Sequence, residues 1–248
     1  PSLGKITLAE TVRIAPPPEQ WLTVKGKKHR GELLLKRSEK SVQPIIQLQL
    51  EDYLRGVVPL EIGKLDTTRF EALKAQAVAA RTYTIRHLGQ RDSAGFDLFD
   101  DTRDQVYGGI SAEDSLVTRA IQETAGLVMT WNGEPIESYY HSTCGGMTAS
   151  LHEVWGKEKL PYLSSQPDLN SNGQPWCAGS AYLNWEFHWS WEQLDQMARN
   201  YLSTARPNPE ISVQRVERLQ VLSYFPDGRV NQLELIGEKG KRTIISGD

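Results

Sequence analysis

The chain has 248 residues, of which 39% are hydrophobic and 24% are charged, and this composition excludes a disordered or low-complexity protein. Its 28 basic and 31 acidic residues give a formal net charge of -3, which argues against nucleic acid or an anionic membrane surface as a partner. The longest apolar stretches have the length of a strand and are far shorter than the roughly 20 residues of a membrane-spanning helix, so we expect no membrane span in this chain.

Residues 1–29 contain a proline run and a cluster of lysines, which is typical of an extended lead-in followed by a solvated turn. One domain is expected over residues 30–248. It begins with two paired strands, at residues 32–36 and 44–50, because the second of these alternates apolar residues with glutamines in the pattern of a half-buried strand.

A short helix is predicted over residues 52–58. Pro59 is expected to end it, because proline restricts the residue before it and lacks a backbone N–H donor. Glu61 would then lie just past a break in the chain.

The most clearly predicted helix spans residues 70–88. A capping box formed by Thr68 and Glu71 marks its start, and Gly89 marks its end. Its many alanines leave little side-chain bulk, so other elements can approach its backbone closely. We therefore expect it to be the central helix of the fold.

Turn and capping signals predict the remaining elements. Asn132-Gly133 is typical of a two-residue hairpin turn, and Ser190 with Gln193 forms a capping box before a helix. In chain order we expect a helix at 112–125, hairpin strands at 127–131 and 134–140, a helix from 191 to about 202, and strands at 213–224, 230–236 and 242–245. Strands and helices in this mixed order indicate the α+β class.

Two stretches carry a specific resemblance. Residues 52–61 read DYLRGVVPLE and residues 71–83 read EALKAQAVAARTY, and together they closely resemble the signature of the SpoIID/LytB family, the stage II sporulation protein D and amidase-enhancer group. Three further segments fit the same family in the same order, at 101–109 (DTRDQVYGG), 141–146 (HSTCGG) and 154–155 (VW). Separated motifs in a fixed order are far more specific than any one motif alone. The resemblance covers about residues 30–248 and implies a SpoIID-like fold.

The resemblance implies an extracytoplasmic lytic transglycosylase of the cell envelope. Enzymes of this family cut the glycan strands of peptidoglycan between N-acetylmuramic acid and N-acetylglucosamine, and prefer strands stripped of their peptides. The family's catalytic acid corresponds to Glu61, no cofactor is required, and the amidase-enhancer name implies a cell-wall amidase as a further partner. The rival hypothesis is a non-catalytic module that binds glycan or stimulates an amidase.

The neighbours of Glu61 suit a general acid independently of the family. Apolar residues surround it on both sides, so its carboxyl is expected to be poorly solvated, which favours the protonated form and keeps a proton available for donation. A lytic enzyme uses the C6 hydroxyl of its substrate as the nucleophile, so one glutamate can act first as acid and then as base and release a 1,6-anhydro sugar. The alternative is a structural glutamate that caps a turn or pairs with Arg55.

Other residues are predicted to bind the substrate. Lys74 and Arg81 are seven positions apart, about two helical turns, so both would point from one face and line a groove beside Glu61, unless they form an ordinary exposed helix face. The resemblance places cleft residues at these two positions and implies sugar contacts by Gln105, Tyr107 and Ser142. Tryptophans are further candidates for sugar platforms, with interior packing as the default, at Trp155, Trp176, Trp185 and Trp189.

The two cysteines, Cys144 and Cys177, allow several interpretations. They can form a disulfide, remain unlinked thiols, or hold a structural zinc together with His141, in which case the fourth ligand would come from His152 or His188. The resemblance suggests zinc because some family members contain it, although Met147 stands where others carry a second histidine. Two further hypotheses are a Cys144 nucleophile with His141 as its base and a metal-dependent hydrolase at the same pair.

The chain departs from the family pattern at its C-terminus. The family domain continues into a glycine-rich stretch containing Gly-His-Gly and Met-Ser-Gln, whereas this chain stops at Asp248 without it. The chain also begins at Pro1 without an initiator methionine, so any export signal would lie outside the printed sequence. We therefore expect a trimmed form of a longer protein.

Overall fold

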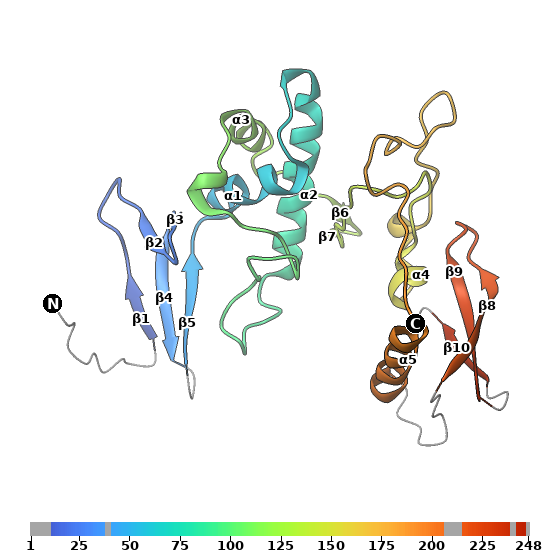
Figure 1. Ribbon diagram of the computed structural model, residues 1–248. Coiled ribbons are helices and arrows are strands. Elements are labelled where there is room, and N and C mark those ends of the chain that lie inside the picture. Colours follow the sequence, from blue (N-terminus) through green and yellow to red (C-terminus); the bar gives the residue numbers. More distant parts are fainter. Residues whose placement is uncertain (1–10, 38–40, 206–214, 239–241, 247–248) are drawn as a thin grey trace. The chain divides into compact units, whose positions relative to one another are not determined.

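The computed structural model describes residues 11–37, 41–205, 215–238 and 242–246. The chain divides into two compact units, Pro1–Tyr140 and His141–Asp248, whose elements are labelled in Figure 1. Each unit combines helices with antiparallel sheet, which confirms the predicted α+β class. The residues expected to form one domain therefore belong to both units. Within the described residues, no helix is both long and apolar enough to cross a membrane.

The first unit begins with a three-stranded antiparallel sheet in the order β1-β4-β5, formed by β1 (Thr11–Ile14), β4 (Glu32–Arg37) and β5 (Val42–Gln47). A small hairpin between β1 and β4 consists of β2 (Leu22–Val24) and β3 (Lys27–His29). The expected lead-in over residues 1–29 is therefore corrected, because its described part contains strands and Val12 of β1 pairs with Leu35 of β4. The alternation of apolar and polar residues in β1 is too short to predict a strand from the sequence. The segment forms an edge strand because it pairs with β4.

Helix α1 spans Leu50–Ile62 and carries Glu61 in its last turn. The prediction that Pro59 ends this helix is wrong, because Pro59 lies inside it. Proline removes one N–H donor, but the turns around it are fixed by fully buried side chains, those of Leu54, Val57 and Val58. The helix ends instead at Gly63, whose φ of 77° is a conformation that favours glycine.

The central helix α2 spans Phe70–His87, close to the predicted range. Its start differs from the prediction, because the Asp66 carboxylate caps a short 3-10 turn before the helix and accepts the backbone N–H of Thr68 at 2.9 Å. The predicted capping box is therefore wrong: Glu71 pairs with Lys74 at 3.1 Å and the helix has no side-chain cap. The backbone N–H of Thr68, which the predicted box would pair with the Glu71 side chain, donates to Asp66 instead.

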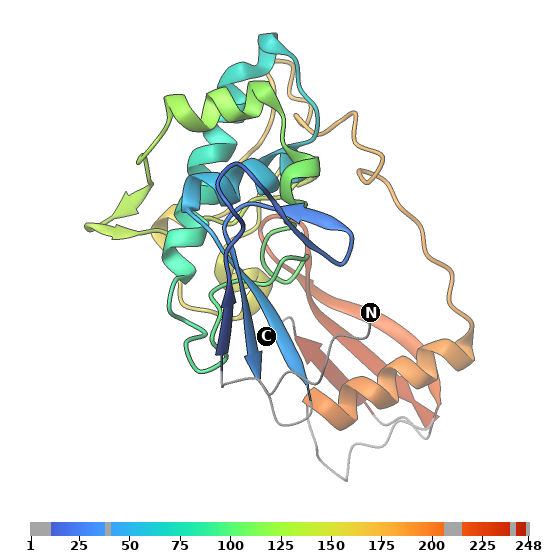
Figure 2. The ribbon, with the colours of Figure 1, turned by 90° about the vertical axis from the view of Figure 1, so that its left-hand side faces the viewer.

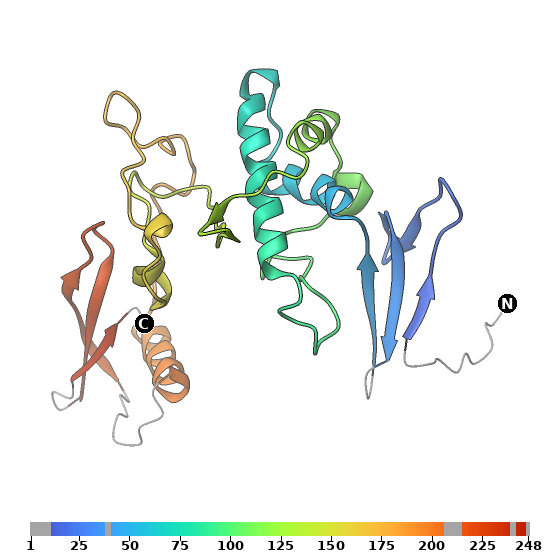
Figure 3. The same ribbon diagram turned by 180° about the vertical axis from the view of Figure 1, so that it is seen from behind.

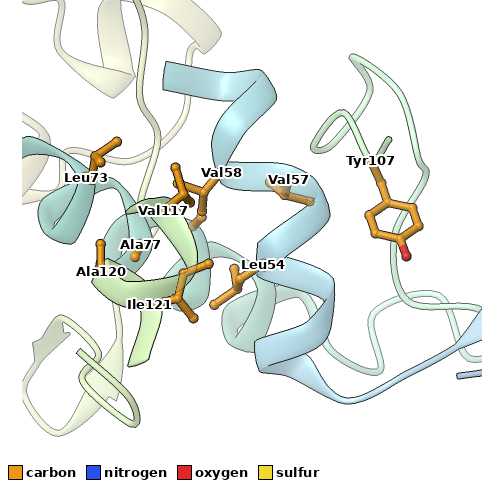
Figure 4. Close-up of a cluster of buried hydrophobic side chains, with 10 residues drawn as sticks. Leu54, Val57, Val58, Leu73, Ala77, Tyr107, Val117, Ala120 and Ile121 are labelled. Carbon is orange, nitrogen blue, oxygen red and sulfur yellow. The ribbon is translucent and has the colours of Figure 1, made fainter. Parts of the chain in front are cut away.

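Helices α1, α2 and α3 (Ser115–Glu123) pack around one hydrophobic core. Figure 4 shows the buried side chains of α2 and α3 on one side of α1, and Tyr107 on the other side. The alanines of α2 at the contact, Ala77 and Ala80, are fully buried, so the expected close approach to this helix is confirmed.

Helix α3 is shorter than the predicted range of 112–125. Asp114 begins it by accepting the backbone N–H groups of Leu116 and Val117 at 2.8 and 3.1 Å. The residues before this cap form a separate 3-10 turn. It is η2 (Gly109–Ala112), and two other 3-10 turns are η1 (Thr67–Arg69) and η3 (Pro161–Leu163).

The predicted hairpin is present but short, with β6 (Thr130–Trp131) paired to β7 (Glu134–Pro135). Asn132 and Gly133 connect the strands with φ values of 51° and 86°, the positive values that a two-residue type I′ turn requires. Figure 2 shows the hairpin extending away from the helices of its unit. The turn was therefore predicted correctly, while the strand lengths were overestimated.

The second unit contains α4 (Leu151–Trp155), α5 (Trp191–Ala205) and a three-stranded antiparallel sheet in the order β10-β9-β8. Figure 3 shows α5 beside this sheet, which is formed by β8 (Val216–Tyr224), β9 (Val230–Gly237) and β10 (Arg242–Ser246). The capping box of α5 is confirmed, because Ser190 and Gln193 bind each other's backbone N–H groups. Residues 213 and 214 of the first predicted strand lie outside the described residues.

Interior packing, the default expectation for the tryptophans of the second unit, is wrong. The segment between α4 and α5 forms turns rather than a packed layer, and most of its aromatic side chains are exposed. The exposed fractions are 53% for Trp155, 70% for Trp176, 71% for Trp185 and 48% for Trp189.

Candidate active site

Glu61 is partly buried in the last turn of α1. Its Oε1 accepts a hydrogen bond from the backbone N–H of Val106 at 2.8 Å. Among the described residues Oε2 has no hydrogen-bond partner, so this oxygen can still form a hydrogen bond with a ligand. The carboxyl is therefore anchored through one oxygen and open at the other.

A buried carboxylate fixes the loop that supplies Val106. Asp104 accepts hydrogen bonds from the Tyr83 hydroxyl at 3.1 Å and from the Phe99 backbone N–H at 2.8 Å. It also pairs with Arg91 at 3.0 Å, and its side chain is only 1% exposed. Charge-assisted hydrogen bonds shielded from water are strong, so the N–H that binds Glu61 is held in place by the fold.

The same loop lies directly against α1. The backbone N–H of Gly108 donates to the carbonyl of Gly56 at 3.0 Å, and Tyr107 stacks on Tyr53 with ring centroids 5.4 Å apart. A Cβ on Gly56 would lie 2.4 Å from the Tyr107 ring, so only glycine permits this approach. Tyr107, predicted to contact sugar, is thus a core residue that places the loop beside Glu61.

Gln105 occupies the centre of a buried hydrogen-bond network. Its Oε1 accepts from the Thr84 hydroxyl at 2.9 Å and from the Tyr53 hydroxyl at 3.3 Å. Its Nε2 donates to the Tyr140 hydroxyl at 3.0 Å and to the Ala80 carbonyl at 3.4 Å. The resemblance implied a sugar contact for Gln105. In the structure the side chain is buried, and its amide oxygen and nitrogen both bind groups inside the protein. Gln105 therefore connects α1 and α2 to Tyr140.

Tyr53 and Tyr140 were not among the predicted site residues. Burial raises the pKa of Tyr140 to about 12; the hydrogen bond with Gln105 offsets part of this rise, and the Glu61 carboxylate adds to it. Burial likewise raises the pKa of Tyr53, and nearby charges including Glu61 add to the rise. Both phenols therefore stay protonated near neutral pH. The Tyr53 hydroxyl donates to Gln105, whereas the Tyr140 hydroxyl accepts from Gln105 and can still donate its own proton. Tyr53 lies inside the first motif and Tyr140 directly precedes the fourth, which was the only sequence signal for them.

Arg81 does not line an open groove. It is 1% exposed, and its guanidinium forms two hydrogen bonds of 2.8 Å to the carboxylate of Glu51. It also donates to the backbone carbonyls of Ile121 at 3.3 Å and Leu127 at 3.2 Å. Arg81 therefore joins the start of α1, the end of α3 and the segment after it, which corrects its expected orientation toward solvent.

Lys74 remains on the surface but is already paired. Its Nζ lies 2.9 Å from Glu123 and 3.1 Å from Glu71. Hydrogen bonds to these two carboxylates raise the pKa of Lys74. The prediction that Lys74 and Arg81 present one cationic face is wrong, because the Arg81 side chain is buried whereas that of Lys74 is 26% exposed and paired at the surface.

Ser142 and His141 lie in the second unit and are exposed. The Ser142 hydroxyl lies 3.4 Å from that of Thr143, and the predicted sugar contact of Ser142 stays a prediction.

The residues expected to hold zinc do not form a set of ligands. Cys144 and Cys177 are free thiols with their Sγ atoms 3.9 Å apart. The possible fourth ligands are engaged elsewhere, since His152 contacts the Lys157 carbonyl and His188 pairs with Glu186. Searched over the described ranges, the chain contains no group of at least three His, Cys, Asp or Glu side chains that could hold a metal. His141, Cys144 and Cys177 therefore do not fit a tetrahedral zinc site in this structure.

Comparisons with known proteins single out the same part of the chain. The family model described as stage II sporulation protein matches residues 38–131, which include α1, α2, α3 and Glu61. An uncharacterized protein of Brachyspira hyodysenteriae is 34% identical over 167 residues, covering 66% of this chain and 45% of that protein. The amidase enhancer of Bacillus subtilis is 37% identical over 142 residues, covering 57% of this chain and 17% of that protein. Stage II sporulation protein D of Bacillus subtilis is 35% identical over 158 residues, covering 55% and 45%.

The chain thus spans less than half of the length of these relatives. The matched residues contain the first three of the motifs that carried the resemblance, together with the anchored carboxyl of Glu61. Over residues 38–131 the chain therefore matches the SpoIID/LytB family.

Proposed function

We propose that this chain acts on the bacterial cell wall as a lytic transglycosylase, cutting denuded glycan strands between N-acetylmuramic acid and N-acetylglucosamine, with Glu61 as both acid and base. The observation that carries the proposal is the state of the Glu61 carboxyl. One oxygen is fixed by the Val106 N–H, and the other is free of partners within the described part of the chain. A proton on Oε2 is therefore positioned without being consumed by an internal hydrogen bond.

In the first step, Oε2 of protonated Glu61 donates its proton to the glycosidic oxygen as the C1–O bond breaks. The departing sugar keeps that proton as a hydroxyl group, and positive charge develops at C1 of the muramic residue. The negative carboxylate that remains stabilises this charge. The Val106 N–H compensates the charge on Oε1, so the carboxylate keeps its place.

In the second step, the Glu61 carboxylate takes the proton of the C6 hydroxyl, and the oxygen of that hydroxyl bonds to C1. The product is a 1,6-anhydro ring, Glu61 is protonated again, and no water is consumed. One carboxyl is sufficient because the two proton transfers occur in sequence. The protonated phenol of Tyr140 can add a hydrogen bond to a sugar oxygen without adding negative charge, because it accepts from Gln105 and keeps its own proton.

The substrate proposed here places the protein outside the cytoplasm, where peptidoglycan is found. A second candidate function is favoured by the match to a protein named amidase enhancer. In that case the chain binds glycan strands and stimulates a cell-wall amidase, and the Glu61 carboxyl contacts sugar without transferring a proton.

Mass spectrometry of a digest separates these functions. The purified chain is incubated with denuded glycan strands, and the new ends are identified. A terminal 1,6-anhydro group supports the lytic reaction. A reducing end to which water has been added would show hydrolysis instead and would contradict the proposal. Intact strands that are retained by the protein would favour the second candidate, provided that the chain also speeds the release of peptides from whole peptidoglycan by an added amidase.

A further inference from the structure

The second unit contains a pair of thiols that no step of the proposed reaction uses. Cys144 and Cys177 are 33 positions apart in sequence, and their Sγ atoms are 3.9 Å apart. Backbone hydrogen bonds already connect the segment after Cys144 with the segment before Cys177. The N–H of Asp168 donates to the carbonyl of Gly146 at 2.9 Å, and the N–H of Trp176 donates to the carbonyl of Asp168 at 3.2 Å.

The two sulfurs have different environments. The Cys144 Sγ donates to the Asp168 carboxylate at 3.1 Å and accepts the backbone N–H of Gly146 at 3.3 Å. The Cys177 Sγ accepts the backbone N–H of Gly145 at 3.3 Å. Burial raises the pKa of Cys144, and the Asp168 carboxylate adds to the rise. Burial would also raise the pKa of Cys177, but the backbone N–H groups around it outweigh burial, so the pKa of Cys177 is lowered. Cys177 is therefore the sulfur that becomes a thiolate more readily.

We propose that Cys144 and Cys177 are a redox pair that closes into an intramolecular disulfide by thiol–disulfide exchange, with Cys177 attacking the oxidant and Cys144 completing the bond. The oxidant is a disulfide of low molecular weight, such as oxidised glutathione, or the disulfide of an oxidoreductase. To form the bond, the two sulfurs must approach from 3.9 Å to about 2.05 Å.

The Cys177 thiolate attacks one sulfur of the oxidant, the S–S bond of the oxidant breaks, and one reduced thiol leaves. Asp168 then takes the proton of the Cys144 thiol, and the Cys144 sulfur attacks Cys177, releasing the second reduced thiol. The two protein thiols have lost two electrons and two protons, and the oxidant has gained them.

The disulfide would close a loop that contains α4 and two isolated bridges, Met147 to Pro167 and Leu169 to Pro175. It would also fix the segment that carries Ser142, since Cys144 lies two residues after it. Oxidation is therefore expected to slow proteolysis between Cys144 and Cys177 and to leave the first unit unchanged.

The experiment treats the full, reduced chain with oxidised glutathione and follows it by intact mass and by thiol titration after denaturation. We expect the chain to lose the mass of two hydrogen atoms and both titratable thiols. The Cys144→Ser variant should stop at a stable adduct with one glutathione on Cys177. The matched Cys177→Ser variant should form its adduct roughly tenfold more slowly, because the remaining thiol is the one with the raised pKa.

The proposal is overturned if both thiols persist in the treated chain, or if the final product carries two glutathiones. The order of the two sulfurs is overturned if Cys177→Ser reacts faster than Cys144→Ser. Purified chain that holds one equivalent of zinc, and that loses its thiol protection when a chelator is added, would assign the pair to a metal instead.

Discussion

Replacing Arg81 tests whether this cation supports the fold or binds substrate. In the structure its guanidinium is buried between Glu51 and two backbone carbonyls, so Arg81→Met should destabilise the first unit. Removing one partner of a buried pair costs about 3–5 kcal/mol. The lower end applies here, about 3 kcal/mol, because the Glu51 side chain is 38% exposed and water can solvate the carboxylate that is left behind.

Lys74→Met is the matched control, since it removes the same charge from the same helix. Lys74 pairs with two exposed carboxylates, so its replacement should cost about 0–1 kcal/mol. Hydrogen exchange measured by mass spectrometry at increasing urea reports on the helices of the first unit separately from the second. If Arg81→Met left their protection within about 1 kcal/mol of the unmodified chain and instead weakened glycan binding, the structural role assigned to Arg81 would be refuted.

Three further changes probe the region around Glu61. Gly56→Ala places a Cβ 2.4 Å from the Tyr107 ring and should cost about 1–3 kcal/mol in urea unfolding, and an unchanged midpoint would contradict the close packing. Tyr140 has a folded pKa of about 12 against about 10 in the unfolded chain, so its contribution to stability is complete below pH ~10 and is lost as the pH rises to about 12. Tyr140→Phe should therefore flatten the decline in stability over that interval, and an unchanged slope would count against the burial of this phenol. Asp114→Ala should cost about 1 kcal/mol by removing the cap of α3, while Asp114→Asn keeps most of it; equal losses in the two variants would exclude the capping role.

Local signals predicted those parts of the fold that local chemistry decides. The positive φ at Asn132 and Gly133 and the capping box at Ser190 follow from side chains within a few residues, and both are present. The end of α1 was mispredicted, because the burial of its apolar side chains outweighs the missing donor of Pro59, and burial depends on helices that come later in the chain.

The sequence motif pointed to Glu61, but it did not predict the contacts that the residues around Glu61 make. The motif singled out Glu61, whose role stays a prediction, and the donor that anchors its carboxyl lies 45 positions away. Gln105 likewise acquires its role from partners 35 and 52 positions away, which no spacing rule along one element can supply. A cation on an amphipathic helix is usually exposed, so the burial of Arg81 could be deduced only once Glu51 was placed opposite it.

The direct test of the account is Glu61→Gln, assayed by the release of fragments with a 1,6-anhydro end from denuded glycan. The amide oxygen of glutamine can still accept the Val106 N–H, so the variant should stay folded, with unchanged hydrogen exchange in α1. Glu71→Gln is the control, because that side chain is 83% exposed. The account predicts no anhydro fragments from Glu61→Gln and the full yield from Glu71→Gln. Fragments released by Glu61→Gln at the rate of the unmodified chain would contradict it.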